Sequence, residues 1–139
     1  MRFSVIVPSF NQPQFIEETF KNLCEIKSCA EENGDSLELL LYDNCSHESV
    51  RNVINRYREH FDYVDISPDS GQHDAINKGI GRMTGEYWTW LNTDDTICID
   101  GFREVSGVLR KHPETDYIYG NISVINDTSM QTEFMKAYP

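Results

Sequence analysis

Hydrophobic positions along this chain alternate between short continuous runs and stripes with helical spacing. The continuous runs predict buried strands over residues 3–8, 37–43, 63–67, 87–91 and 117–119. The stripes predict helices after Pro13, after a cap at Ser46 or Ser49, over residues 74–83, and from about Asp100. Strands that alternate with helices indicate βαβ units. The chain is therefore expected to adopt an α/β fold, with a mostly parallel sheet and helices on both faces.

Periodicity also predicts which side chains of two late elements are buried. Trp88 and Trp90 lie two residues apart, so their indoles share one face of a strand, and we expect that face in the core. The helix that begins near Asp100 is expected to bury its apolar stripe, which consists of Phe102, Val105, Val108 and Leu109.

The pattern weakens after residue 120. Residues 122–125 can begin a further strand, whereas residues 130–139 have the character of a tail. We therefore expect a core over residues 1–120, followed by residues 121–139 as the start of a second half or as an irregular tail. This pattern is typical of a domain truncated on its C-terminal side.

Composition narrows the class of protein. The 139-residue chain is 39% hydrophobic and 25% charged, as in an ordinary globular domain. Its net charge of −11 comes without a basic cluster, which disfavours nucleic acid and anionic membrane surfaces as partners. No apolar run is long enough for a transmembrane segment, and residues 1–8 begin directly with a strand rather than a secretory signal. We therefore expect a cytoplasmic protein with reduced thiols.

Candidate chemistry gathers in the loops that follow the predicted strands. The carboxyl ends of parallel strands lie at one edge of a sheet, where α/β proteins bind their ligands. This edge is expected to carry the carboxylates of Asp43, Asp69, Asp74, Asp94 and Asp95. A turn or a helix cap explains each of them alone. Their concentration on one rim instead favours a site for a divalent cation and a diphosphate.

Four segments resemble successive motifs of the family 2 glycosyltransferases. They are Ser-Val-Ile-Val-Pro-Ser-Phe-Asn at 4–11, Leu-Tyr-Asp-Asn-Cys-Ser at 41–46, Asp-Ser-Gly-Gln-His-Asp-Ala-Ile-Asn-Lys-Gly at 69–79, and Gly-Glu-Tyr-Trp-Thr-Trp-Leu-Asn-Thr-Asp-Asp at 85–95. The resemblance covers residues 3 to about 120 and implies the GT-A fold, which has a Rossmann-like sheet. It also implies an inverting enzyme that uses a nucleotide sugar. This chain would be its N-terminal, nucleotide-sugar-binding part.

The resemblance implies how the nucleobase is bound. Pro8, Phe10 and Asn11 match the loop that packs beside the base in the family. Asp43 matches the carboxylate that accepts a hydrogen bond from a base N–H. This role favours a donor of the UDP or TDP type, although guanine also offers N–H donors.

The resemblance also assigns the ribose and the diphosphate. Asp69, Gly71 and Asp74 match the segment that runs along them, where glycine allows close approach of the backbone. Asn77 belongs to an Ala-x-Asn-x-Gly element that recurs in the family.

The resemblance places the sugar and the metal at the acidic pair. Asp94 matches a carboxylate that faces the sugar or ribose, and Asp95 matches the one that binds Mn²⁺ or Mg²⁺. Some relatives carry a basic residue at the position of Ile76. Its absence here leaves neutralisation of the phosphates to Lys78, Arg82 or the metal.

The resemblance further implies a glycan or lipid-linked glycan as acceptor, in bacterial surface polysaccharide synthesis. An inverting transfer needs a base to deprotonate the acceptor hydroxyl. In the family this base lies well beyond the metal-binding pair, and nothing marks Asp127 or Glu133 for the role. The catalytic base is therefore unknown and expected outside this chain. We expect a donor-binding domain that transfers poorly by itself.

Other classes of protein fit less well. No Gly-x-Gly-x-x-Gly follows the first strand, as a dinucleotide-dependent oxidoreductase requires, and the Gly-Lys-Ser/Thr of a P-loop is missing. The remaining alternative is a non-catalytic remnant that binds a nucleotide or a protein partner. An incomplete fold also exposes apolar surface, so self-association is expected.

Overall fold

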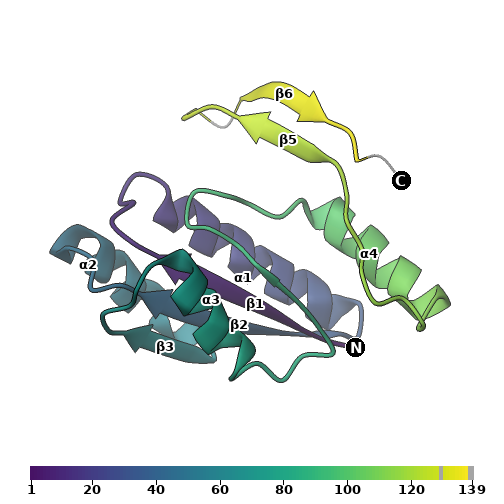
Figure 1. Ribbon diagram of the computed structural model, residues 1–139. Coiled ribbons are helices and arrows are strands. Elements are labelled where there is room, and N and C mark those ends of the chain that lie inside the picture. The colour runs from purple at the N-terminus through teal and green to yellow at the C-terminus, as the bar shows by residue number, and fades with distance from the viewer. Residues whose placement is uncertain (129, 138–139) are drawn as a thin grey trace. The chain divides into compact units, whose positions relative to one another are not determined.

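The computed structural model describes residues 1–128 and 130–137, whose helices and strands are drawn in Figure 1. The elements in chain order are β1 (Arg2–Ser9), α1 (Ile16–Glu32), β2 (Ser36–Asp43), α2 (Glu48–Tyr57), the 3-10 turn η1 (Arg58–His60), β3 (Tyr63–Ile66), α3 (Gln72–Ile80), β4 (Tyr87–Trp90), α4 (Ile99–Lys111), β5 (Ile122–Ile125) and β6 (Gln131–Met135). The chain divides into two compact units, Met1–Ile99 and Asp100–Pro139. The expected boundary after residue 120 concerns the halves of the family fold and stays a prediction.

The first unit contains a four-stranded parallel sheet with the strand order β3-β2-β1-β4. β1 pairs with β2 along its whole length, from Arg2 opposite Ser36 to Ser9 opposite Asp43. The expected α/β class and parallel sheet are therefore confirmed.

Helix α3 covers one face of this sheet. Side chains alternate between the two faces along a strand, and Ile6, Leu40 and Tyr42 form an apolar cluster with Ala75 of α3. The helix lies close to the sheet because Gly79 has no side chain. A Cβ at that position would lie 2.5 Å from Cγ2 of Ile6.

Helices α1 and α2 lie on the opposite face (Figure 1), where α1 contacts both β2 and α2. The ring of Phe20 packs edge-on against the rings of Phe61 and Tyr57, with centroid distances of 4.8 and 5.8 Å. The buried residues of α1 include Ile16, Phe20, Leu23 and Ile26, whose helical spacing agrees with the helix expected after Pro13. Both faces of the sheet are thus covered by helices, as expected.

The order in which strands are added reverses between β1 and β4. β2 and β3 lie on one side of β1, whereas the crossover through α3 brings β4 to its other side. Such a reversal opens a crevice outside the carboxyl ends of the two central strands. Ser9 ends β1 and Trp90 ends β4, so the loops that follow these residues border the crevice.

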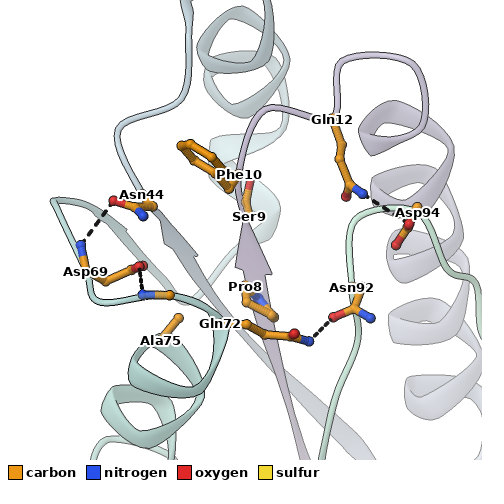
Figure 2. A pocket seen from close by; sticks show the side chains of 11 residues that line it. Pro8, Ser9, Phe10, Gln12, Asn44, Asp69, Gln72, Ala75, Asn92 and Asp94 are labelled. Carbon is orange, nitrogen blue, oxygen red and sulfur yellow. Dashed lines mark hydrogen bonds between the residues drawn. The ribbon is translucent and has the colours of Figure 1, made fainter.

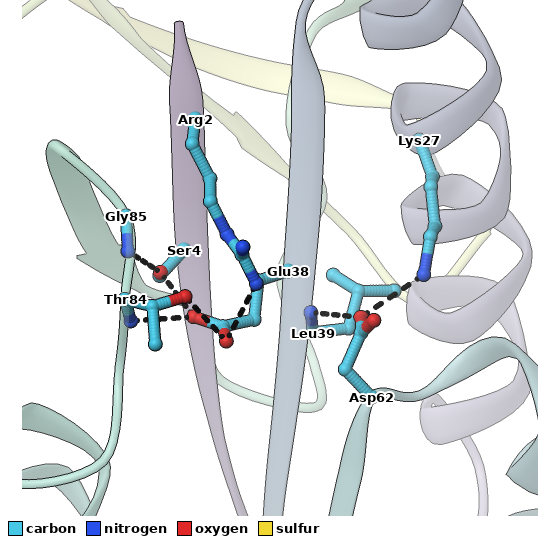
Figure 3. Close-up of polar contacts among 8 residues, drawn as sticks. All are labelled: Arg2, Ser4, Lys27, Glu38, Leu39, Asp62, Thr84 and Gly85. Carbon is cyan, nitrogen blue, oxygen red and sulfur yellow. Dashed lines mark hydrogen bonds and ion pairs between the residues drawn. The ribbon is translucent and has the colours of Figure 1, made fainter.

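A buried carboxylate fixes the connection between α3 and β4 (Figure 3). Glu38 accepts hydrogen bonds from Ser4 Oγ at 2.6 Å and from the Thr84 N–H and hydroxyl, each at 2.9 Å. Arg2 lies 3.2 Å from the same carboxylate, and Ser4 Oγ accepts the N–H of Gly85 at 2.9 Å. Burial by itself would raise the pKa of Glu38. The hydrogen bonds and the charge of Arg2 outweigh burial and hold this pKa below its ordinary value.

The second unit consists of α4 and an antiparallel hairpin of β5 and β6. Asn126 Oδ1 accepts the N–H groups of Thr128 and Met130 at 3.0 and 2.9 Å, which closes the turn between the strands. The expected strand over residues 122–125 is confirmed by β5.

Two expectations near the C-terminus are wrong. Residues 117–119 are irregular rather than a strand, because this short run has no partner strand among the described residues. Residues 131–135 form β6 rather than part of a tail, because they pair with β5. Residues 138–139 of the expected tail lie outside the described residues.

Two predictions of burial are also wrong. Trp88 and Trp90 are 41% and 50% exposed, because β4 is an edge strand and α3 packs on β1 and β2. In α4, Val108 is 44% exposed and Ser106 is buried with Phe102 and Leu109. The buried stripe of that helix is thus narrower and rotated from the one expected.

The cap expected for α2 also differs. The N-cap residue is His47, which makes no capping bond with its side chain. Ser46 instead donates its hydroxyl to Asp43 at 2.6 Å.

All four cysteines are free thiols. Within the described residues, no helix has the length and apolar character needed to cross a bilayer.

Candidate functional site

An open pocket of about 330 Å³ lies at the carboxyl ends of the parallel strands, where the order of the sheet reverses. Its lining comes from the loops after β1, β2, β3 and β4 and from the start of α3 (Figure 2). The lining residues are Pro8, Ser9, Phe10, Gln12, Asn44, Asp69, Gly71, Gln72, Ala75, Asn92 and Asp94. The topology has therefore brought distant loops into one site, as the sequence predicts.

Asp43 supports the floor of this site without lining the pocket. Its side chain is buried, and the residue is only 1% exposed. Oδ1 accepts the hydroxyls of Ser9 and Ser46 at 2.8 and 2.6 Å, and Oδ2 accepts the Ser46 N–H at 2.8 Å. The next residue, Asn44, lines the pocket instead.

Asn11 joins the loops that follow β1 and β2. Its N–H donates to Ser46 Oγ at 3.0 Å, and its Oδ1 accepts the N–H of His47 at 2.8 Å. Its φ of 50° is in the left-handed region, which asparagine tolerates better than most residues. Asn11 therefore shapes the rim from outside the pocket lining.

The loop between β3 and α3 forms another wall. Asp69 Oδ1 accepts the N–H of Gly71 at 2.8 Å, and the N–H of Asp69 donates to Asn44 Oδ1 at 3.1 Å. Asp74 accepts the N–H of Ser70 at 3.1 Å, and this bond is the main reason that its pKa is lowered. The carboxylate thus fixes the first turn of α3.

The loop after β4 forms the third wall, through Asn92 and Asp94, and Asp95 follows directly. Gln12 Nε2 donates to Asp94 Oδ2 at 3.0 Å, and Asn92 Nδ2 donates to Asp95 Oδ2 at 3.3 Å. Partial burial raises the pKa of Asp95, and the charge of Asp94 raises it further against the hydrogen bond from Asn92. The pair therefore concentrates negative charge that its neutral neighbours do not offset.

The predicted site residues divide into two groups. Those that line the pocket are Pro8, Phe10, Asp69, Gly71 and Asp94. Those that do not are Asn11, Asp43, Asp74, Asn77 and Asp95. Asn77 lies exposed on α3, whereas Asn11, Asp43 and Asp74 hold the loops in place.

Sequence reasoning gave no role to other lining residues, namely Ser9, Gln12, Asn44, Gln72, Ala75 and Asn92. All of them lie in or next to the motifs at the strand ends. Ala75 is apolar, and the others carry neutral amide or hydroxyl groups, so none of them adds to the charge pattern that marks the carboxylates.

The donor set at Asp94 and Asp95 limits the kind of metal site that is possible. The described residues contain no group of three or more His, Cys, Asp or Glu that could hold a metal ion. Mg²⁺ is usually held by one or two carboxylates, with waters and substrate phosphates completing its shell, and Mn²⁺ prefers the same oxygen ligands. The pair therefore fits a cation that arrives with a phosphate-bearing ligand, rather than one held by the protein alone.

Curated proteins similar to this chain are glycosyltransferases. The putative teichuronic acid biosynthesis glycosyltransferase TuaG of Bacillus subtilis is 30% identical over 95 residues, which are 66% of this chain and 35% of the relative. The GalNAc(5)-diNAcBac-PP-undecaprenol beta-1,3-glucosyltransferase of Campylobacter jejuni is 24% identical over 138 residues, which are 96% of this chain and 42% of the relative. The chain thus spans less than half the length of these relatives.

Solved structures share its architecture. S. aureus TarS 1-349 in complex with UDP-GlcNAc has a TM-score of 0.68 and 22% identity, over 81% of this chain and 32% of that one. Mannosyltransferase PcManGT from Pyrobaculum calidifontis, in complex with GDP-Man and Mn²⁺, has a TM-score of 0.65 and 23% identity, over 90% of this chain and 36% of that one. These likenesses confirm the expected GT-A fold.

The family model for Glycosyl transferase family 2 matches residues 4–137. This match covers all of the parallel sheet except the first two residues of β1, and every loop that lines the pocket. The chain therefore belongs to glycosyl transferase family 2.

Proposed function

We propose that this chain forms the donor-binding part of an inverting, metal-assisted glycosyltransferase. The donor would be a nucleoside-diphosphate sugar, and the acceptor a hydroxyl group of a glycan or lipid-linked glycan. One observation carries the proposal: the pocket at the reversal of the sheet is lined both by Asp94 of the acidic pair after β4 and by Gly71 and Gln72 at the N-terminus of α3. A helix N-terminus favours phosphate, and adjacent carboxylates favour the cation that accompanies a diphosphate.

The nucleobase would lie between the loops that follow β1 and β2. Phe10 is 58% exposed at the pocket and offers a flat apolar surface for stacking. Asn44 Oδ1 already accepts a hydrogen bond from Asp69, which leaves the Asn44 amino group to donate to a base carbonyl. Uracil and thymine offer such carbonyl acceptors, so UDP- and TDP-type donors stay favoured. Asp43 would hold this loop rather than read the base directly.

The diphosphate would lie along Asp69, Gly71 and the first turn of α3, with the sugar or ribose near Asp94. Asp95 would bind Mn²⁺ or Mg²⁺, assisted by Asp94. A divalent cation there supplies Lewis-acid stabilisation of the departing nucleoside diphosphate. The carboxylates of the chain hold and orient that cation, and α3 orients the phosphates through its backbone N–H groups.

The residues of this chain indicate less about the acceptor than about the donor. Two similar proteins carry names that refer to teichuronic acid and to an undecaprenol-linked glycan, so we propose a role in bacterial polysaccharide synthesis. No residue is assigned as the catalytic base, because nothing in the surrounding sequence marks Asp127 or Glu133 for the role. The expected cytoplasmic location stays a prediction. The alternative function is a non-catalytic remnant that binds a nucleotide or a protein partner.

The first test is a thermal-shift panel with UDP, TDP, GDP and ADP, each with and without Mn²⁺. Ligand at about a hundred times Kd stabilises the folded state by roughly 2.7 kcal/mol, which raises the Tm by roughly 5–10 °C for a domain of this size. We expect this shift with UDP or TDP in the presence of Mn²⁺. The Asp95→Asn variant should lose the Mn²⁺-dependent part of the shift.

Asp116→Asn is the matched control, because it removes a carboxylate from an exposed position that does not line the pocket. It should keep the full Mn²⁺-dependent shift. The same Mn²⁺ response in Asp95→Asn and in the wild type would contradict the metal assignment. Sugar transfer to a glycan acceptor, even if slow, would contradict the non-catalytic alternative.

A further inference from the structure

Gln12 connects the end of β1 to the acidic pair after β4. Its Oε1 accepts the hydroxyl of Thr93 at 2.7 Å, and its Nε2 donates to Asp94 Oδ2 at 3.0 Å. Thr93 is only 1% exposed, so one end of the carboxamide is held by a buried group. The backbone is also fixed, because Gln12 O accepts the N–H groups of Phe15 and Ile16 at 3.3 and 3.2 Å. The side chain therefore presents its amino group to Asp94 in a defined orientation.

Asn92 makes the corresponding contact on the other carboxylate. Its Nδ2 donates to Asp95 Oδ2 at 3.3 Å, and its Oδ1 accepts Gln72 Nε2 at 2.6 Å. Figure 2 shows both bridges at the pocket, with Gln72 reaching Asn92 on one side and Gln12 reaching Asp94 on the other. Each carboxylate thus has one oxygen held by a neutral amide.

The backbone that carries the pair is anchored as well. The hydroxyl of Thr19 on α1 donates to the carbonyl oxygen of Asp95 at 2.9 Å. Asn22, one turn further along α1, exchanges hydrogen bonds of 2.7 and 3.0 Å with the backbone of Ile97. The loop is therefore fixed on both sides of the carboxylates, and the amides decide how the carboxylate groups themselves are turned.

We propose that Gln12 and Asn92 are positioning residues for the cation that accompanies the nucleotide. Each carboxamide holds one carboxylate oxygen and leaves the other, Oδ1 of Asp94 and of Asp95, for the cation. This assignment rests on the proposed function and adds to it the groups that orient the metal-binding carboxylates. Partners of this kind set the orientation of metal ligands, and their loss commonly lowers metal affinity about 10- to 100-fold.

The chemistry of a carboxamide suits this task. In the described part of the chain, no lysine, arginine or histidine forms an ion pair with Asp94 or Asp95. A cationic partner would offset the negative charge that attracts the metal, whereas an amide donates a hydrogen bond and leaves that charge in place. A neutral donor can therefore orient the carboxylates without competing with the cation.

The test compares the binding of UDP with and without Mn²⁺ by titration calorimetry. The ratio of the two Kd values measures the coupling between metal and nucleotide, and the wild-type chain sets its reference value. Gln12→Met keeps the length of the side chain and removes both hydrogen bonds. We expect this variant to lose about tenfold of the coupling, measured against its own Kd for UDP alone. Mn²⁺ electron paramagnetic resonance of the same samples gives an independent measure of the bound ion.

Gln14→Met is the matched control, since Gln14 is exposed in the same loop and does not line the pocket. It should keep the wild-type coupling. Thr93→Val is a second variant that leaves Asp94 untouched but removes the hydroxyl that orients Gln12, and it should lose a smaller part of the coupling. If Gln12→Met and Thr93→Val fold and keep the wild-type coupling, the role of Gln12 is overturned, whereas the proposed metal site is not. No Mn²⁺ coupling in the wild type would overturn the proposed metal site together with this role.

Discussion

At the scale of single residues, Gly71 has the most demanding backbone at the pocket. Its φ of 112° and ψ of 179° fall in a region that only glycine adopts readily. Open space surrounds the position, since an added Cβ would meet no atom within 4 Å. Gly71→Ala should therefore act through backbone strain and cost about 1–3 kcal/mol of unfolding free energy. Because the strain would move the wall of the pocket, the variant should also weaken the response to UDP and Mn²⁺.

Gly34→Ala separates these two effects. Gly34 also has a positive φ, 73°, and also has no atom within 4 Å of an added Cβ, but it does not line the pocket. The Gly34→Ala variant should lose about 1–2 kcal/mol of unfolding free energy, measured by chemical denaturation, and keep the wild-type Kd for UDP. Equal nucleotide affinity in the two variants would mean that the conformation of Gly71 has no part in binding.

Residue type alone predicts which carboxylates lie near the strand ends, but not which partners each of them has in the fold. The carboxylate of Asp43 was expected to contact the base, and the structure surrounds it with the donors of Ser9 and Ser46. Whether a side chain points into a pocket or under its floor depends on the exact turn of a loop, which a motif does not encode. The sequence does not mark Gln12 for a related reason, because its contacts are with residues about 80 positions away.

At the scale of elements, Glu38 ties the connection between α3 and β4 to the centre of the sheet. Its pKa is held below the ordinary value, so the folded state binds a proton on this group less readily than the unfolded chain does. The resulting stabilisation is present above the pKa of the unfolded state and is lost as the pH falls through the lower, folded-state pKa. Glu38→Gln should therefore lower the Tm at neutral pH, and the gap from wild type should close in acid.

Glu25→Gln is the control for Glu38, because Glu25 is an exposed residue of α1. Its Tm should follow that of the wild type throughout a series of thermal melts from neutral to acid pH. A constant difference between Glu38→Gln and the wild type over that series would mean that the hydrogen bonds matter and the charge does not.

The elements themselves were largely predictable, and the failures have a common cause. The four strands of the parallel sheet and the helices between them follow from local periodicity, because each apolar run or helical stripe lies within one short segment of the sequence. The irregular run at 117–119 and the hairpin strand β6 depend on which partner strand is present. β-Propensity reports a tendency to fit a sheet rather than the sheet that will be joined.

At the scale of the whole molecule, an apolar strand edge favours association between copies of the chain, and the high net charge opposes it. β4 is an edge strand of its sheet, and it exposes Trp88 and Trp90 on one face. Open strand edges and exposed aromatic side chains favour association between copies. The net charge of −11 opposes it through repulsion, which salt screens over about 10 Å at 0.1 M. The expected self-association should therefore strengthen with ionic strength as well as with concentration.

Light scattering coupled to size-exclusion chromatography measures this balance directly. The wild-type mass should rise above 16.1 kDa with increasing protein and salt concentrations. The double variant Trp88→Thr, Trp90→Thr keeps β-propensity but removes the aromatic surface, so it should stay monomeric at the same salt. Phe134→Thr, at an exposed position of the hairpin, should behave like the wild type if β4 is the surface that associates. A wild-type mass of 16.1 kDa at every concentration would show that charge repulsion outweighs the attraction at the exposed edge. Loss of association only in Phe134→Thr would show that copies associate through the second unit instead.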